Sequence, residues 1–433
     1  MEYLIFSIYF IVFIAIIVNG KFFQSTQMSK KILIGLFVIK ILFSGFYFAY
    51  YKNADRPSDT QRFFTQAKTL YQKSFDNPRQ FFNIISNVSF GRQTQSSGIF
   101  GIIPEDEIPY GTDYTHESRF VVHLTALLMF FSGPYYLVLL LIYAFFAFCG
   151  SVFLYKYFAP QDKKNQVISI IACFMIPSTI FWASGISKEV LFFFFISLTL
   201  FVLHQCIYQK WGIKYIVILC LSLAGMMYSK LHLAIIFIPL MFIYIFCYYN
   251  NNKWLIKYGC GLFILFIISV VVRFFAYDSY FDIWYAIQYQ NNCFIGLEQH
   301  LHPDGQTDIY LPFLEDSFLS IFNAIPIALF NVIYYPAIQT TDIYHFFAGM
   351  ETLLFIGLSI NLCIRLFKRK IDNDSLFLLL FCLLSFILIG LCTPNVGALC
   401  RYKSVCLPFL FYLSLNTQNS FRPILSHTQN NKQ

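Results

Sequence analysis

Residues 134–155 read PYYLVLLLIYAFFAFCGSVFLY, and no charged side chain interrupts them. A helix needs about 20 consecutive apolar residues to cross roughly 30 Å of hydrocarbon. In lipid, each backbone N–H and C=O group must also find its hydrogen-bond partner inside the segment, which a helix provides. This stretch therefore predicts a membrane-spanning helix.

Similar runs recur along the chain and predict an all-α, polytopic transmembrane helical bundle. Hydrophobic residues make up 58% of the 433 positions and charged residues only 12%, whereas soluble domains carry roughly 25% charged residues. We expect one transmembrane domain over 1–416 and a disordered cytoplasmic tail over 417–433, which is rich in Asn and Gln. The predicted crossings, about eleven, are 3–19, 32–51, 134–155, 167–183, 190–208, 213–229, 231–249, 258–276, 345–364, 375–393 and 404–416.

Basic side chains indicate how the bundle is oriented. They gather in alternate loops, which the positive-inside rule places in the cytoplasm. The N-terminus is then outside and the tail inside. Because the net charge of +8 is spread over these loops and forms no single basic face, we expect no nucleic-acid partner. The loops are marked by Lys21, Lys30 and Lys31; Lys156, Lys163 and Lys164; Lys210 and Lys214; Lys253 and Lys257; and Arg365, Lys368, Arg369 and Lys370.

Two long loops lie on the opposite, extracytoplasmic side, at 52–133 and 277–344. Within them, 119–132 and 319–336 are apolar but short, and Gly or Pro residues interrupt or flank them. Counting either one as a crossing would break the alternation of basic loops. The sequence therefore predicts interfacial or re-entrant helices at these two places.

Several common chemistries have no motif in this chain. The twelve Cys residues form no CxxC pair, and there is no P-loop, no GxGxxG and no metal-ligand spacing. ATP-driven transport and Rossmann-type cofactor chemistry are therefore not indicated. No cofactor is predicted with certainty, and the question of a divalent cation is left open.

The first candidate stretch is Asp55-Arg-Pro-Ser-Asp59-Thr-Gln-Arg62, directly outside the second predicted crossing. A pattern through Ala67, Leu70 and Tyr71 follows it and predicts an amphipathic helix at the membrane surface. Asp59 is a candidate general base toward a hydroxyl group. The alternative is that Asp59 only caps that helix, since Asp is a favoured N-cap residue.

Two further stretches lie at predicted outside turns. In Pro177–Glu189, Lys188 lies near the N-terminus of the next helix, where it favours either a bound phosphate or compensation by the adjacent Glu189. In Tyr228–His232, Lys230 and His232 add one cation and one imidazole. For the lysines in both stretches the alternative is an anchor at the membrane interface.

A fourth stretch, Thr393–Lys403, precedes the last predicted crossing. Arg401 offers a planar fork that suits phosphate oxygens, while Tyr402 and Lys403 are equally typical of an anchor at the headgroups.

Three more ionisable residues fall within predicted crossings, namely Lys40, Arg273 and Glu351. Since buried charges of opposite sign usually pair, we expect an ion pair among them.

Taken together, an acid after an early crossing, cations at later outside turns and interfacial helices resemble the GT-C class of polyprenyl-phosphate-sugar-dependent glycosyltransferases, in particular bacterial exopolysaccharide and cell-envelope members. Three stretches carry the resemblance: 58–64, 177–189 and 395–403. Family members often have Gly-Asp, Asp-x-Asp or Glu-x-Asp at the first of these sites, whereas here Ser58 precedes Asp59 and Asp55 lies four residues away.

The resemblance implies an enzyme that transfers a sugar from a lipid-linked phosphate donor to a glycan acceptor, at the extracytoplasmic face of a bacterial inner membrane. Asp59 would be the base, and Lys188, Arg401, Lys230 and His232 would bind the donor phosphate. Acceptor contacts or supporting roles would fall to Asp55, Glu117, Glu189, Tyr402 and Lys403. Two alternatives stay open: an O-antigen or exopolysaccharide polymerase, and a flippase or transporter.

Overall fold

The computed structural model describes residues 1–52, 59–86, 116–208, 211–250, 253–277, 279, 282–301, 309–337, 343–368 and 371–416. Within these ranges the chain forms helices and no strands, which confirms the all-α class. Eight of the described helices are long and apolar enough to cross a membrane. The predicted tail, 417–433, lies outside the described residues.

The long apolar helices agree with eight of the predicted crossings. They are α1 (Glu2–Asn19), α3 (Lys30–Lys52), α7 (Tyr136–Phe158), α10 (Lys188–Tyr208), α12 (Leu231–Tyr249), α13 (Trp254–Phe275), α16 (Ile343–Lys368) and α17 (Asn373–Cys392).

The remaining described helices are shorter or more polar. They are α2 (Lys21–Gln24), α4 (Asp59–Asp76), α5 (Pro78–Ser86), α6 (His116–Ser132), α8 (Lys163–Phe174), α9 (Pro177–Trp182), α11 (Ile213–Ser229), α14 (Ile283–Leu301), α15 (Phe318–Tyr334), α18 (Val396–Lys403) and α19 (Leu407–Leu415).

Three predicted crossings have a different form in the structure. The helix α11 matches 213–229 but is only 17 residues long, and 404–416 corresponds to α19, which joins α18 at a bend of 56°. The pair α18 and α19 counts as a ninth crossing if it forms one bent span. The total of about eleven therefore stays a prediction.

The third, 167–183, is broken into α8 and α9. Pro177 has no N–H to donate, and the residue before a proline is disfavoured in helical geometry. Ile176 accordingly has an extended backbone, with φ −69° and ψ 117°. The break turns the chain toward the start of α10, so that the residues before Lys188 form a tight turn.

The amphipathic helix predicted after Asp59 is α4. Its apolar face buries Phe63, Ala67 and Leu70 in a small core that also contains Val122 and Ala126 of α6. Gly133 ends α6 with φ +70°, and a Cβ atom there would lie 2.7 Å from the Tyr135 ring. The short apolar segments 119–132 and 319–336 are the helices α6 and α15.

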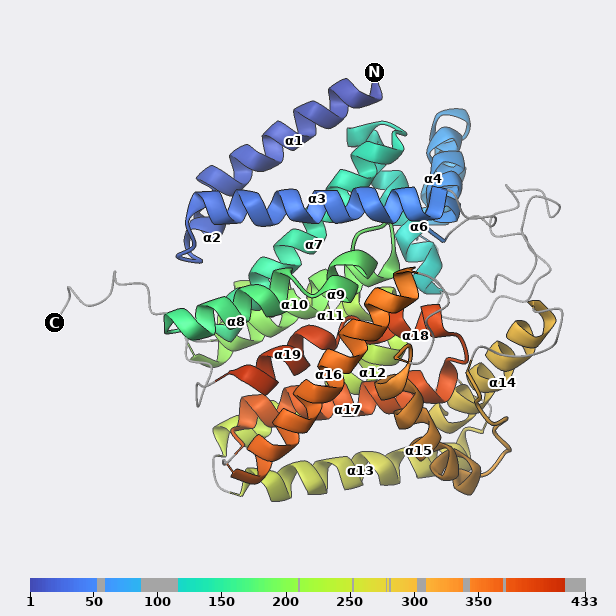
Figure 1. Ribbon diagram of the computed structural model, residues 1–433. Coiled ribbons are helices and arrows are strands. Elements are labelled where there is room, and N and C mark those ends of the chain that lie inside the picture. The colour runs from blue at the N-terminus through green and yellow to red at the C-terminus, as the bar shows by residue number, and fades with distance from the viewer. Residues whose placement is uncertain are drawn as a thin grey trace.

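A large apolar core joins the two ends of the chain. Figure 1 shows α1 and α3 along one edge of the bundle and α13 along the opposite edge, with α7 and α10 between them. The core includes Phe37 of α3 and Phe192 of α10. The rings of Phe158 in α7 and Tyr412 in α19 stack with centroids 3.8 Å apart. Burying such rings provides most of the packing energy in a core of this kind.

We predict that Cys293, which is exposed on α14, reacts with a membrane-impermeant maleimide in intact cells, because α14 follows the eighth predicted crossing on the extracytoplasmic side. Cys293→Ser should remove that label. A cysteine introduced by Asn373→Cys at the start of α17 should react only after the cells are permeabilised. Labelling of Asn373→Cys in intact cells would reverse the assigned orientation.

Candidate functional site

Charged residues from five helices and one interhelical turn meet at one end of the bundle. We call this group the ionic cluster. It contains Asp59 and Arg62 of α4, Glu117 of α6, Lys188 and Glu189 of α10, Lys230 before α12, His232 of α12 and Arg401 of α18. Residues of the three stretches 58–64, 177–189 and 395–403 thus lie side by side, although Asp59 and Arg401 are 342 residues apart in the chain.

The carboxylate of Asp59 lies between two guanidinium groups. Its Oδ2 accepts a hydrogen bond of 2.8 Å from Nη1 of Arg401, and its Oδ1 accepts one of 2.5 Å from Nη2 of Arg62. Burial raises the pKa of this carboxyl, but the charges of Arg401, Lys188 and Arg62 outweigh that effect and hold the pKa of Asp59 below its usual range. Asp59 is therefore an ionised carboxylate at any ordinary pH.

Glu189 and Lys230 form a buried ion pair next to the contact between Asp59 and Arg401. Oε1 of Glu189 is 3.0 Å from Nζ of Lys230 and 3.3 Å from Nε of Arg401, and the side chains of Glu189 and Lys230 are only 2% and 1% exposed. The Tyr402 ring covers Lys230, whose Nζ is 4.1 Å from the ring centroid. Buried charges persist only when paired in this way.

Glu117 contacts the remaining members of the cluster, Lys188 and His232. Its Oε1 accepts a hydrogen bond of 2.9 Å from the backbone N–H of Leu231 at the start of α12, where a negative charge stabilises the helix. Its Oε2 is 3.6 Å from Nζ of Lys188, and Nδ1 of His232 is 3.5 Å from Oε1. The sequence left open either a bound phosphate or the adjacent Glu189 as compensation for Lys188. In the structure, the carboxylate that forms an ion pair with Lys188 is that of Glu117.

A close approach of the backbone makes these contacts feasible. A Cβ atom on Gly185 would lie 2.5 Å from the Tyr47 ring and 2.8 Å from Oγ1 of Thr60. Only glycine leaves room there for the turn before α10 to pack against α3 and α4. That packing places Lys188 and Glu189 beside Asp59.

Of the other predicted site residues, Tyr402 borders the cluster through its ring, whereas Lys403 and Asp55 are not placed there. Nζ of Lys403 instead donates hydrogen bonds of 2.6 Å and 3.2 Å to the carbonyl oxygens of Tyr335 and Val332, near the end of α15. Asp55 lies outside the described residues. Lys403 thus stabilises the C-terminal end of a neighbouring helix.

The expected ion pair among Lys40, Arg273 and Glu351 is wrong, because each residue has a different partner. Arg273 lies 2.9 Å from Asp282 and also pairs with Asp316. Glu351 accepts hydrogen bonds from the hydroxyl group of Ser178 and from its backbone N–H, at the start of α9. A periodic pattern gives no information about such pairings.

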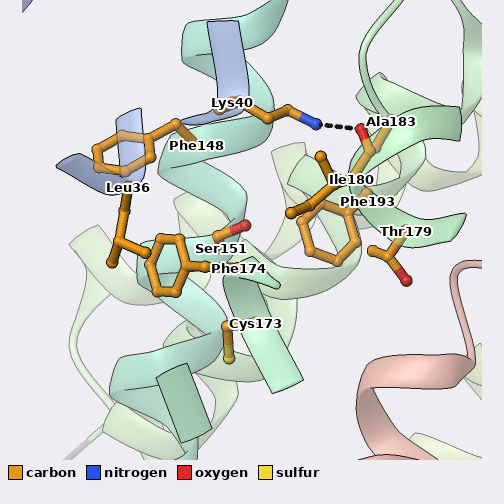
Figure 2. Close-up of a pocket in the computed structure, with 10 residues that line it drawn as sticks. All are labelled: Leu36, Lys40, Phe148, Ser151, Cys173, Phe174, Thr179, Ile180, Ala183 and Phe193. Atoms are coloured by element: carbon orange, nitrogen blue, oxygen red, sulfur yellow. Dashed lines mark hydrogen bonds between the residues drawn. The ribbon is translucent and has the colours of Figure 1, made fainter. Parts of the chain in front are cut away.

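Lys40 binds the other end of the same short helix. Its Nζ donates a hydrogen bond of 2.9 Å to the carbonyl oxygen of Ile180. Figure 2 shows Lys40 among the residues that line a cavity, together with Phe148 and Cys173. The volume of this cavity is about 10 Å³. A cavity of this size holds at most one water molecule. The helix α9 is thus held by an acid at its start and a base at its end.

Arg62 is a cluster member to which the sequence assigned no role. The available signal was its spacing of three residues from Asp59, which places both side chains on one face of a helix. Among the described residues, no group of three or more His, Cys, Asp or Glu side chains could hold a metal ion. The question of a divalent cation stays open, since Asp55 is not among those residues.

Comparisons with protein-family models, with curated proteins and with solved structures give no match for this chain. The function is therefore argued from the ionic cluster itself.

We predict that Glu189→Gln lowers the free energy of unfolding by about 3–5 kcal/mol, because it leaves Lys230 as an uncompensated charge in the interior. Thermal unfolding of the purified protein in detergent measures the loss. Glu315→Gln, on an exposed loop, is the matched control and should change stability by no more than about 0.5 kcal/mol.

The double variant Glu189→Gln with Lys230→Met removes both charges of the pair. It should recover part of the lost stability, since an apolar replacement of a buried pair is often tolerated. If the double variant is no more stable than Glu189→Gln alone, the two side chains are not coupled and the ion pair is unimportant for folding.

Proposed function

We propose that this protein is a membrane glycosyltransferase. It moves a sugar from a lipid-linked phosphate donor to an acceptor hydroxyl at the extracytoplasmic side of a bacterial inner membrane, in the synthesis of a cell-surface polysaccharide or glycan. The observation that carries the proposal is the contact of 2.8 Å between Asp59 and Arg401. It puts a carboxylate that can accept a proton next to a cation that can hold a phosphate.

The exposed members of the cluster have complementary roles in this reaction. The acceptor oxygen bonds to the anomeric carbon while the bond from that carbon to the phosphate oxygen breaks, and the hydroxyl proton passes to Asp59. Asp59 is 32% exposed and Arg401 20% exposed, so both are open to a ligand. Arg401 and Lys188 stabilise the negative charge that develops on the leaving phosphate.

The deeper residues position the others. Lys230 is 1% exposed, which argues against direct contact with a donor phosphate. We assign it, with Glu189 and Tyr402, to holding Arg401 in place. His232 is 37% exposed and lies on the Lys188 side, where it can contact either the donor or the acceptor.

The charge balance also suits this chemistry. The ionic cluster holds four cations and three carboxylates when His232 is neutral, which leaves one net positive charge. When Asp59 takes the acceptor proton, the cluster becomes more positive by one unit. That change coincides with the growth of negative charge on the phosphate, where it stabilises the transition state most.

The paired guanidinium groups of Arg62 and Arg401 make an exopolysaccharide polymerase the second candidate, because we expect such enzymes to rely on paired arginines. A transporter fits less well. Alternating-access proteins bind their substrates near the membrane midplane, whereas Asp59 and Lys188 are the first residues of α4 and α10.

We predict that Asp59→Asn lowers sugar transfer by about 10² to 10⁴-fold, because the amide cannot accept the proton. Purified protein with polyprenyl-phosphate sugars and a glycan acceptor is the assay. Asp76→Asn, at the exposed end of the same helix, is the matched control and should keep full activity.

A helix cap would respond differently, since Asn caps a helix about as well as Asp and the change would be nearly silent. If Asp59→Asn keeps near-normal transfer while Glu117→Gln or Asp55→Asn is inactive, Asp59 is not the general base. The carboxylate whose loss abolishes transfer would then have that role.

We predict that Arg401→Lys impairs transfer nearly as much as Arg401→Ala, by about 10² to 10³-fold. Arg401 contacts Asp59 through Nη1 and Glu189 through Nε, and a single ammonium group cannot reproduce both contacts. Rates and expression levels of both variants should be compared with Arg79→Lys, at an exposed position on α5. Full activity of Arg401→Lys would reduce Arg401 to an interface anchor.

A further inference from the structure

We infer that Arg62 and Arg401 form an anion-binding site that Asp59 fills when no ligand is present, and that the phosphate of the donor displaces the Asp59 carboxylate on binding. The inference rests on the proposed function for the identity of the anion. It adds Arg62 as a phosphate-contacting residue and makes Asp59 an internal competitor of the donor.

The geometry of the contact resembles the binding of an oxyanion. Each oxygen of Asp59 accepts a hydrogen bond from a different guanidinium group, at 2.5 Å from Arg62 and at 2.8 Å from Arg401. Guanidinium groups recognise carboxylates and phosphates through the same planar pattern of N–H donors. A phosphate oxyanion can therefore take the place of this carboxylate without a change in the donor set.

The three residues also belong to the part of the cluster that a ligand can reach. The exposed fractions are 27% for Arg62, 32% for Asp59 and 20% for Arg401, whereas Glu189 is only 2% exposed. An anion that arrives from outside thus meets the two arginines before it meets any buried carboxylate.

Arg401 can release Asp59 without losing its own position. Its Nη1 binds Asp59, while its Nε faces Glu189 at 3.3 Å. Because separate atoms of the guanidinium group make the two contacts, the Glu189 contact persists when the carboxylate leaves. The site is therefore preorganised for the ligand that replaces Asp59.

Displacement also changes Asp59 as a base. A carboxylate held by two guanidinium groups has little affinity for a proton, and the charged or titratable groups around it are Arg62 of α4, Lys188 of α10, Arg401 of α18 and Tyr51 of α3. Once phosphate neutralises the arginines, the carboxylate regains its basicity. The base thus becomes competent only when the donor is present.

Binding of polyprenyl monophosphate to the purified full-length protein in detergent tests the inference directly. Asp59→Asn should tighten binding by about tenfold, the factor expected when the open site is about a tenth of the population. Adding Arg62→Gln to Asp59→Asn should remove that gain. Uncharged polyprenol should bind all three proteins alike, and inorganic phosphate should bind at least about tenfold more weakly than polyprenyl monophosphate if the site serves the lipid-linked donor.

Unchanged or weaker binding of polyprenyl monophosphate by Asp59→Asn would overturn the inference. So would an equal gain for polyprenol, because the lipid chain and not the phosphate would then be responsible. Inorganic phosphate that binds as tightly as polyprenyl monophosphate would contradict a donor site. Size-exclusion profiles of the variants verify that they are folded, and Asn at position 59 still suits the start of α4.

The pH dependence of transfer gives a second readout. The profile of kcat/KM reports the free enzyme and that of kcat reports the donor complex. Because Asp59 is more basic once the donor has displaced it, we expect the acid limb of the kcat profile to lie at higher pH than that of the kcat/KM profile. If the two acid limbs coincide, displacement of Asp59 is contradicted. Absence of sugar transfer would remove the proposed function but leave the binding test intact, so the two failures are distinguishable.

Discussion

A single buried carboxylate determines how this site is built. Glu189 lies in the first turn of α10 with a side chain only 2% exposed, and a lone charge at that depth would cost several kcal/mol. It must therefore have cations beside it, and they come from the turn before α12 and from α18. This requirement joins the middle of the chain to its C-terminal part, and the other contacts of Arg401 depend on it.

The ionic cluster consequently has two layers. The lower layer, formed by Glu189 and Lys230 beside the Tyr402 ring, is almost closed to solvent. The upper layer, which includes Asp59 and Arg62, is open enough to exchange partners. Arg401 contacts both layers. When a ligand replaces Asp59 in the upper layer, the contact of Arg401 with Glu189 in the lower layer therefore stays in place. Preorganisation of this kind lets charged groups stabilise a transition state without moving.

The sequence predicted the parts of this protein that follow from local chemistry. Runs of apolar residues located eight long helices, and the spacing of Ala67 and Leu70 located the surface helix α4. It could not show which charges meet, because the pairing of Lys188 with Glu117 depends on packing between distant segments. Nor did it anticipate the break at Pro177, since hydropathy alone does not register the loss of one backbone donor.

The short helix α9 is held by charged residues from two distant helices. Glu351 of α16 binds its first turn and Lys40 of α3 binds one of its carbonyl oxygens, so each charge is opposite in sign to the partial charge of the helix end that it meets. Position 351 thus suits an acid, and position 40 suits a base. Exchanging them, with an acid at 40 and a base at 351, would preserve the net charge yet oppose the dipole at both ends, so compensating mutations cannot restore this arrangement by charge reversal.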